Sequence, residues 1–226
     1  LHCSAHTKAK IHMKFIETTE IEEGKISAAD ALQGVNGVIV PGGFGSRGAE
    51  GKLKVITFCR ENNVPILGIC FGLQLMVVEF ARNVCLMEKA HSTEIEPSTA
   101  YPVVDLMPEQ KNVSLKGATM RLGGYISYLR EGSLVRKLYH SEIVSERHRH
   151  RYEVNPAYHK LLQEKGLDIS GLYLEKNLTE FIELKNNHYF IATQAHPELK
   201  SRLSDPAPLF IGLVNAVIER KKLSGM

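Results

Sequence analysis

The chain has 226 residues, of which 43% are hydrophobic and 23% charged, a composition that fits a globular protein with a sizeable buried core. Its net charge of +3 is too small to predict nucleic-acid binding. The four cysteines show neither a Cys-x-x-Cys pair nor a zinc-like Cys/His spacing, so we expect a cytoplasmic protein without disulfides or a metal site.

Predicted strands and helices alternate in the first part of the chain. A β-branched apolar run at 37–40 predicts a buried strand that ends in the glycine loop Pro41-Gly42-Gly43, and residues 64–69 predict a second strand. The segments 52–62 and 73–82 predict the helices that follow these strands. This alternation favours a mostly parallel sheet with helices on both faces.

Further strands are predicted at 101–104, 181–184 and 189–194, and the last two form an antiparallel hairpin. A helix over 209–220 closes the chain. We find no repeat or linker, and therefore expect one domain over residues 1–226. Its predicted class is α/β, with a mostly parallel central sheet, helices on both faces and a small antiparallel hairpin near the C-terminus.

A glycine-rich loop, Gly43-Phe44-Gly45-Ser46-Arg47-Gly48, matches the G-x-G-x-x-G pattern of dinucleotide-binding proteins. That function requires an acidic residue at the end of the next strand, which here ends at Gly68-Ile69-Cys70. A P-loop is also excluded, because Leu53 occupies the position of the required Ser or Thr. The loop is therefore interpreted either as a turn that needs positive φ or as a loop that binds an oxyanion or the substrate.

The segment Gly68-Ile69-Cys70-Phe71-Gly72 has the spacing of a nucleophile elbow, with cysteine in place of serine. It lies between a predicted strand and a predicted helix, and its two glycines permit the tight turn. A helix N-terminus favours the thiolate, which is the attacking form. We therefore predict that Cys70 is a nucleophile, and that Cys3, Cys59 and Cys85, which lack such surroundings, are not.

A base and an acid for Cys70 follow the last predicted strand, in Gln194-Ala195-His196-Pro197-Glu198. Residues two apart in an extended segment project to the same side, so Glu198 can orient one imidazole nitrogen while the other faces the thiol. An isolated His-x-Glu is usually a surface pair. Its occurrence after a cysteine elbow predicts a catalytic triad of Cys70, His196 and Glu198.

Three motifs in this order resemble those of the class I, or triad, glutamine amidotransferases: Pro41-Gly42-Gly43, Gly68-x-Cys70-x-Gly72-x-Gln74 and His196-Pro197-Glu198. Other stretches resemble the amidotransferase domains of the CTP synthase family, namely 41–48, 78–83, 92–94, 119–123 and above all the basic run within 146–155. The resemblance implies a flavodoxin-like three-layer fold and hydrolysis of L-glutamine to glutamate and ammonia through a thioester on Cys70.

The resemblance also implies roles for other residues. Main-chain amides of Gly43 and Phe71 would form an oxyanion hole. The glutamine site would comprise Gly43, Phe71, Gly72, Leu73, Gln74, Glu94 and Arg151. In that site Glu94 would face the substrate amine, and the planar fork of Arg151 would suit its carboxylate. GTP activates hydrolysis in the family, and the implied GTP contacts are Arg121 and Arg149.

The implied partners lie outside the chain. In the family, ammonia passes to an N-terminal synthetase domain, which uses ATP and Mg²⁺ to aminate UTP to CTP in a homotetramer. The chain does not begin with methionine, and we expect such a domain to precede Leu1. The amidotransferase domain itself would need no cofactor. No apolar run approaches the roughly 18 residues of a membrane span, so no membrane partner is expected.

Three alternatives stay open. The chain could be an amidotransferase of GMP or anthranilate synthesis, against which the basic run 147–151 argues. It could be a non-catalytic domain of the same fold, although Cys70, His196 and Glu198 are all intact. It could also be a cysteine peptidase on a related fold, which a test of free glutamine as substrate would separate.

Overall fold

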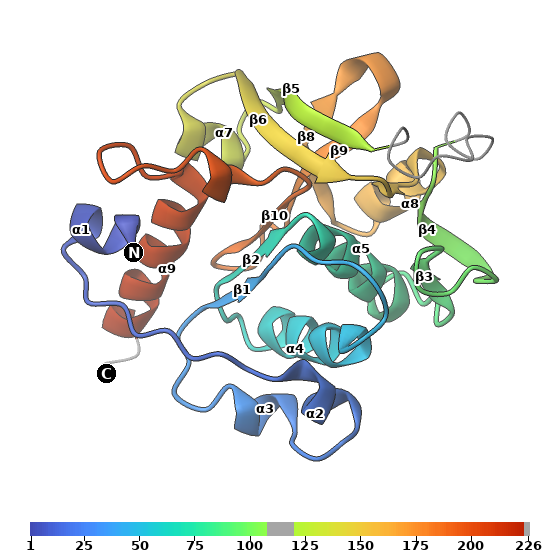
Figure 1. The fold of residues 1–226 in the computed structure, drawn as a ribbon, viewed down its shortest axis with the longest axis horizontal. Helices are drawn as coiled ribbons and strands as arrows, with labels where there is room; N and C mark the ends of the chain where they lie inside the picture. Colours follow the sequence, from blue (N-terminus) through green and yellow to red (C-terminus); the bar gives the residue numbers. More distant parts are fainter. Residues whose placement is uncertain (108–119, 224–226) are drawn as a thin grey trace.

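The computed structural model describes residues 1–107 and 120–223, so Thr119 of the motif 119–123 lies outside the described residues. The strands, shown in Figure 1, are β1 (Val38–Val40), β2 (Ile66–Ile69), β3 (Ala90–Ser92), β4 (Tyr101–Asp105), β5 (Arg121–Leu129), β6 (Ile143–His150), β7 (Glu153–Val154), β8 (Asp168–Tyr173), β9 (Leu178–Glu183) and β10 (Phe190–Thr193). The α-helices are α1 (His2–Thr7), α2 (Thr18–Glu22), α3 (Ala28–Ala31), α4 (Ala49–Glu61), α5 (Phe71–Asn83), α7 (Leu134–Tyr139), α8 (His159–Glu164) and α9 (Pro208–Leu223). Short 3₁₀ helices are η2 (Pro156–Tyr158), η3 (Leu174–Lys176) and η4 (Pro197–Leu199).

A seven-stranded sheet has the order β1-β2-β10-β9-β8-β5-β6, and a smaller sheet has the order β3-β4-β7. Strand β2 pairs in parallel with both β1 and β10, whereas the other neighbours in the large sheet are antiparallel. The α/β class and the β9–β10 hairpin are confirmed, but the sheet is mixed rather than mostly parallel. The connections from β8 to β9 and from β9 to β10 are too short for the crossovers that parallel strands require.

Helices cover both faces of the large sheet. One apolar core lies between the sheet and α4 and α5, and a second lies under α7 and α9. Adjacent strand residues serve opposite faces, since Ile66 belongs to the first core and Leu67 to the second. Both side chains are fully buried, and each such aliphatic burial stabilises the fold by about 1.5–3 kcal/mol.

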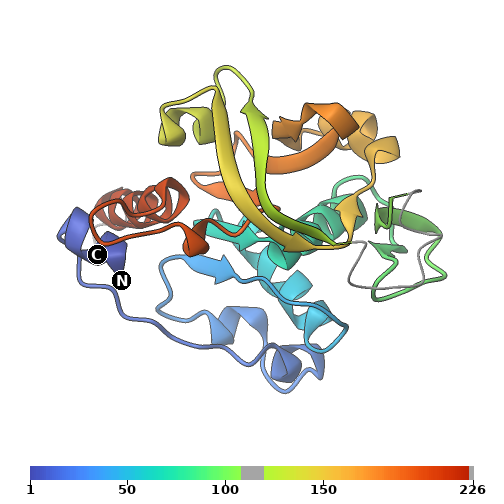
Figure 2. The ribbon, with the colours of Figure 1, turned by 45° about the horizontal axis from the view of Figure 1, so that its top comes forward.

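The predicted strands and helices are confirmed as β1, β2, β4, β9, β10, α4, α5 and α9, with ends that shift by a few residues. The basic run 147–151 lies mostly in β6, which the sequence did not reveal as a strand. Its side chains alternate, with Arg147 and Arg149 exposed and His148 and His150 buried. Figure 2 shows β5 and β6 as a long, curved ribbon at the edge of the sheet. Among residues 1–107 and 120–223, no helix is long and apolar enough to cross a bilayer.

Candidate active site

The elbow around Cys70 joins the end of β2 to the start of α5. Cys70 has φ 52° and ψ −103°, a sparsely populated conformation for a residue with a Cβ, and such strain costs about 1–3 kcal/mol. A Cβ on Gly68 would lie 2.5 Å from the Met76 sulfur, and a Cβ on Gly72 would lie 2.2 Å from the Val40 carbonyl oxygen. Both flanking glycines are therefore required by the close approach of helix and strand.

The positions of Cys70 and His196 follow from the parallel pairing of β2 and β10. Ile69 aligns with Thr193, and the amide of Cys70 donates to the Thr193 carbonyl oxygen at 2.7 Å. The segments that follow β2 and β10 therefore leave the sheet at the same edge. A Cβ on Gly42 would lie 2.8 Å from Cε1 of His196 and 3.7 Å from Cβ of Cys70, so the loop after β1 contacts both side chains.

The imidazole of His196 lies between Cys70 and Glu198. Its Nδ1 is 2.6 Å from Oε1 of Glu198. The hydrogen bond with Cys70, and then that with Glu198, raises the pKa of His196 to about 10. The imidazole therefore carries its proton at neutral pH. The structure thus brings together the three side chains that the sequence predicts as a triad, with Glu198 at its exposed end.

A Glu198→Gln substitution should lower the pKa of His196, because an amide oxygen carries no full negative charge. Folding raises the pKa of His196, so its contribution to stability is fully present below the unfolded value of about 6.5. It is then lost as pH rises through the folded value of about 10. We expect the stability difference between wild type and variant to shrink over this interval in urea unfolding series. Glu164→Gln, at an exposed position on α8, is the matched control. A constant difference across this pH range would contradict the assignment.

Glu94 lies beside the glycine-rich loop, where the amide of Gly45 donates to its Oε1 at 3.2 Å. Burial raises the pKa of Glu94, against the attraction of the nearby Arg151. Arg151 directly follows β6, two residues beyond the carbonyl of Arg149 that contacts the Cys70 thiol. The carboxylate and the guanidinium predicted to bind glutamine are therefore neighbours at the site.

The remaining predicted site residues divide into two groups. Gly43 lies against Phe71, since a Cβ on Gly43 would be 3.7 Å from Cδ1 of Phe71, and Gly72 follows in the elbow. Phe71 opens α5, where the first amides have no carbonyl partner within the helix. The side chains of Leu73 and Gln74, in contrast, are buried at 0% and 3% exposure, so any contact of Leu73 with substrate falls to its main chain.

The two residues predicted to face GTP have different environments. The Arg149 side chain is exposed on β6. Arg121 is 8% exposed, and its guanidinium lies 3.3 Å from Glu153 and 2.7 Å from Glu180. Arg121 therefore points into the protein and is not brought to the same surface as Arg149.

Two kinds of contact at Cys70 escape the sequence motifs. Sγ of Cys70 lies 3.9 Å from the carbonyl oxygen of Arg149, and the amide of His196 donates to the carbonyl oxygen of Arg147 at 2.7 Å. The fully buried Gln194 places Nε2 3.7 Å from Sγ of Cys70. The alternation of Arg and His over 147–150 was the available signal for the strand that supplies the two carbonyls.

Within the described ranges, no group of three or more His, Cys, Asp or Glu side chains is arranged to hold a metal ion. The side chains that the site brings together are a thiol, an imidazole and a carboxylate, with main-chain amides at the elbow. These are the components of an acyl-transfer site with a cysteine nucleophile.

Residues 1–216 match the model of the class-I glutamine amidotransferase family, and the chain belongs to this family. Within it, the chain belongs with the amidotransferase domains of CTP synthases. The CTP synthases of Methanocaldococcus jannaschii and Pyrococcus furiosus are each 53% identical to it over 98% of its length. The chain spans only 42% and 41% of these two relatives.

A solved structure supports the same placement. The glutaminase domain of Trypanosoma brucei CTPS, with bound acivicin, is 35% identical to the chain and superposes with a TM-score of 0.88. The match covers 96% of this chain and 84% of that one. The similarity therefore extends over nearly the whole chain.

Proposed function

We propose that the chain is a glutaminase, in which Cys70 attacks the side-chain amide of L-glutamine to release ammonia and glutamate. The observation that carries this proposal is the placement of Cys70 and His196 against the same loop at Gly42, together with the bond between His196 and Glu198. The placement of the chain with amidotransferase domains supports glutamine as the amide.

The first stage begins from a thiolate beside a protonated imidazole. The sulfur of Cys70 adds to the amide carbon, and the amides of Gly43 and Phe71 stabilise the negative charge on the oxygen. When the C–N bond breaks, His196 gives its proton to the leaving nitrogen. Ammonia departs, and a γ-glutamyl thioester remains on Cys70.

The second stage removes the acyl group. His196, now neutral, accepts a proton from water, and the resulting hydroxide attacks the thioester carbon. The C–S bond breaks, glutamate is released, and the thiolate–imidazolium pair is restored. Glu198 holds the ring through its bond to Nδ1 in both stages, which leaves Nε2 for the reacting atoms.

Recognition of glutamine requires one negative and one positive group, which Glu94 and Arg151 supply beside the loop. We expect Glu94→Gln to raise KM for glutamine about tenfold or more, because it removes the charge that faces the substrate ammonium. The turnover number should change less. Glu96→Gln is the control, since Glu96 lies in the same segment but its Oε1 accepts from Ser98 instead. Equal KM values for the two variants would show that Glu94 does not bind the substrate.

The function is tested by incubating the protein with free glutamine and measuring glutamate and ammonia together. Equimolar release supports a glutaminase. Asparagine and short peptides, offered under the same conditions, test the alternative of a cysteine peptidase. Cleavage of peptides without hydrolysis of glutamine would overturn the proposal.

The role in a longer protein is part of the same proposal. The chain matches about two fifths of the CTP synthase relatives. We therefore assign the use of ammonia, in the ATP- and Mg²⁺-dependent amination of UTP, to a synthetase domain outside this sequence. A cytoplasmic homotetramer is proposed on the same basis. For GTP activation, the exposed Arg149 fits a ligand contact, whereas the burial and pairing of Arg121 do not.

A further inference from the structure

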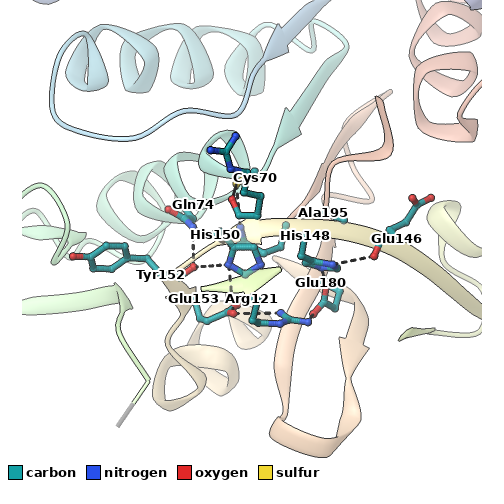
Figure 3. Close-up of polar contacts among 12 residues, drawn as sticks. Cys70, Gln74, Arg121, Glu146, His148, His150, Tyr152, Glu153, Glu180 and Ala195 are labelled. Atoms are coloured by element: carbon teal, nitrogen blue, oxygen red, sulfur yellow. Dashed lines mark hydrogen bonds and ion pairs between the residues drawn. The ribbon is translucent and has the colours of Figure 1, made fainter. Parts of the chain in front are cut away.

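We propose that a buried charge cluster positions the Cys70 site through strand β6. The cluster consists of five side chains, which are Arg121, His148, His150, Glu153 and Glu180. All are at most 8% exposed. Figure 3 shows them beneath Cys70 and Gln74, with the two histidines above a row of Glu153, Arg121 and Glu180. None of the five is a catalytic residue, because none touches the reacting atoms.

The contacts inside the buried charge cluster link four strands. Arg121 on β5 lies between Glu153 on β7 and Glu180 on β9, at 3.3 and 2.7 Å. Both histidines come from β6. His148 bonds through Nε2 to Glu180, and Nδ1 of His150 lies 3.4 Å from Glu153. Each histidine of β6 therefore lies against a carboxyl group that Arg121 also contacts, and His148 is hydrogen-bonded to its own.

This arrangement matters because β6 is an edge strand. Within the described residues it pairs with β5 alone in the large sheet, so its other edge presents main-chain groups that no strand of that sheet pairs with. That edge supplies the carbonyl of Arg149 to the Cys70 thiol and the carbonyl of Arg147 to the amide of His196. The exposed side chains of these arginines make neither contact. The position of the whole strand sets the geometry of the thiol and the imidazole.

A second route reaches the elbow through Tyr152. The carbonyl oxygen of Tyr152 accepts from Nε2 of Gln74 at 2.9 Å and lies 3.1 Å from Nδ1 of His150. Gln74 also donates to Gln194, whose amide contacts the Cys70 sulfur. Hydrogen bonds thus connect the buried charge cluster to the first turn of α5, which carries the nucleophile at its N-terminus.

Stability alone is a weak explanation for such a cluster. Burying charges costs solvation free energy, and packed apolar side chains of similar size often stabilise a core as well or better. The directional hydrogen bonds and ion pairs instead fix the register of β6 and its position relative to Cys70. A displacement of about 1 Å at a reacting group can cost about 100-fold in rate, so this precision has a catalytic consequence.

The test compares two isosteric substitutions on the same strand. Glu180→Gln removes the charge that holds Arg121 and His148. Glu183→Gln is the matched control, because Glu183 is also buried on β9 but accepts from the amides of Leu134 and Val135 at the start of α7. The inference rests on the proposed function, so two rates are measured: glutamine hydrolysis, and alkylation of Cys70 by iodoacetamide, which needs no glutamine.

We expect Glu180→Gln to lower kcat for glutamine and the rate of Cys70 alkylation by about tenfold or more. Glu183→Gln should leave both rates within about twofold of wild type, even if the two variants lose similar stability in urea. Equal rates in the two variants would overturn the positioning role. If Cys70 of the wild-type protein is alkylated but glutamine is not hydrolysed, the proposed function fails. The alkylation rates of the two variants still decide the role of the cluster.

A second pair covers the case in which Glu180→Gln does not fold. Arg121→Lys keeps the charge of the cluster but loses the planar fork that reaches two carboxylates. Arg130→Lys is its control, because Arg130 pairs with Asp168 beyond the end of β5. Slower alkylation in Arg121→Lys alone supports the inference. Unchanged alkylation in Arg121→Lys contradicts it.

Discussion

Replacing Cys70 with alanine should abolish glutamine hydrolysis, lowering kcat by about four orders of magnitude or more, because the attacking atom is lost. The fold should persist, since alanine keeps the Cβ and removes only the sulfur from a site that is 4% exposed. Glutamate release and urea unfolding, measured on the same preparation, separate the two effects. Activity of the folded variant above this limit would show that another group attacks the amide.

The same reasoning predicts which cysteine an electrophilic glutamine analogue modifies. Burial raises the pKa of Cys3 and Cys85, and it raises that of Cys59 to about 12, so their thiolates are scarce at neutral pH. Cys70 has a protonated imidazole beside it. Peptide mapping after treatment with an electrophilic glutamine analogue should therefore find the label on Cys70 alone. Unmodified Cys70 in folded protein, or label on another cysteine, would contradict the assignment.

Gly72→Ala should destabilise the protein by about 3 kcal/mol or more, at the upper end of the range for overpacked sites. The added Cβ would lie 2.2 Å from the Val40 carbonyl oxygen, which belongs to the main chain of β1 and cannot move without disturbing the sheet. Gly43→Ala is the control, since its Cβ would meet its nearest neighbour at an ordinary 3.7 Å. Urea unfolding midpoints provide the comparison, and equal midpoints for the two variants would refute the steric argument.

The elbow, and the placement of Cys70, His196 and Glu198 at one site, could be predicted because residue types and spacing there are set by local chemistry. A nucleophile on a tight strand-to-helix turn needs glycines at fixed positions, and the contacts of Gly68 and Gly72 account for both. The histidine and its carboxylate lie two residues apart in one segment. Short-range patterns of this kind can be recognised in the sequence without knowledge of the tertiary structure.

The combination of parallel and antiparallel strands in the large sheet could not be predicted from such local patterns. Strand β5 contains Gly123 and Gly124, and β6 contains charged and imidazole side chains where a buried strand normally has apolar ones. The burial of His148 and His150 depends on carboxylates from other strands. Only the folded structure reveals those partners, so apolar periodicity did not predict β5 and β6 as strands.

Main-chain contacts were the least accessible part of the site. The carbonyls of Arg147 and Arg149 would be present with any residue at those positions, so residue type carries no information about them. The resemblance also placed Arg121 near GTP, without a means of distinguishing a buried arginine from an exposed one. Its two carboxylate partners are separated from it by more than thirty residues, 32 for Glu153.

The pairing of β10 with β2 has a consequence for the synthesis of the protein. The nucleophile lies in the first third of the chain, but Gln194, which contacts its sulfur, lies 124 residues later, and β10 occupies the sheet between β2 and β9. A ribosome must therefore release nearly the whole chain before the thiol can meet its imidazole. Prematurely terminated products would carry the elbow without its base, so an unfinished polypeptide would lack the proposed glutaminase site.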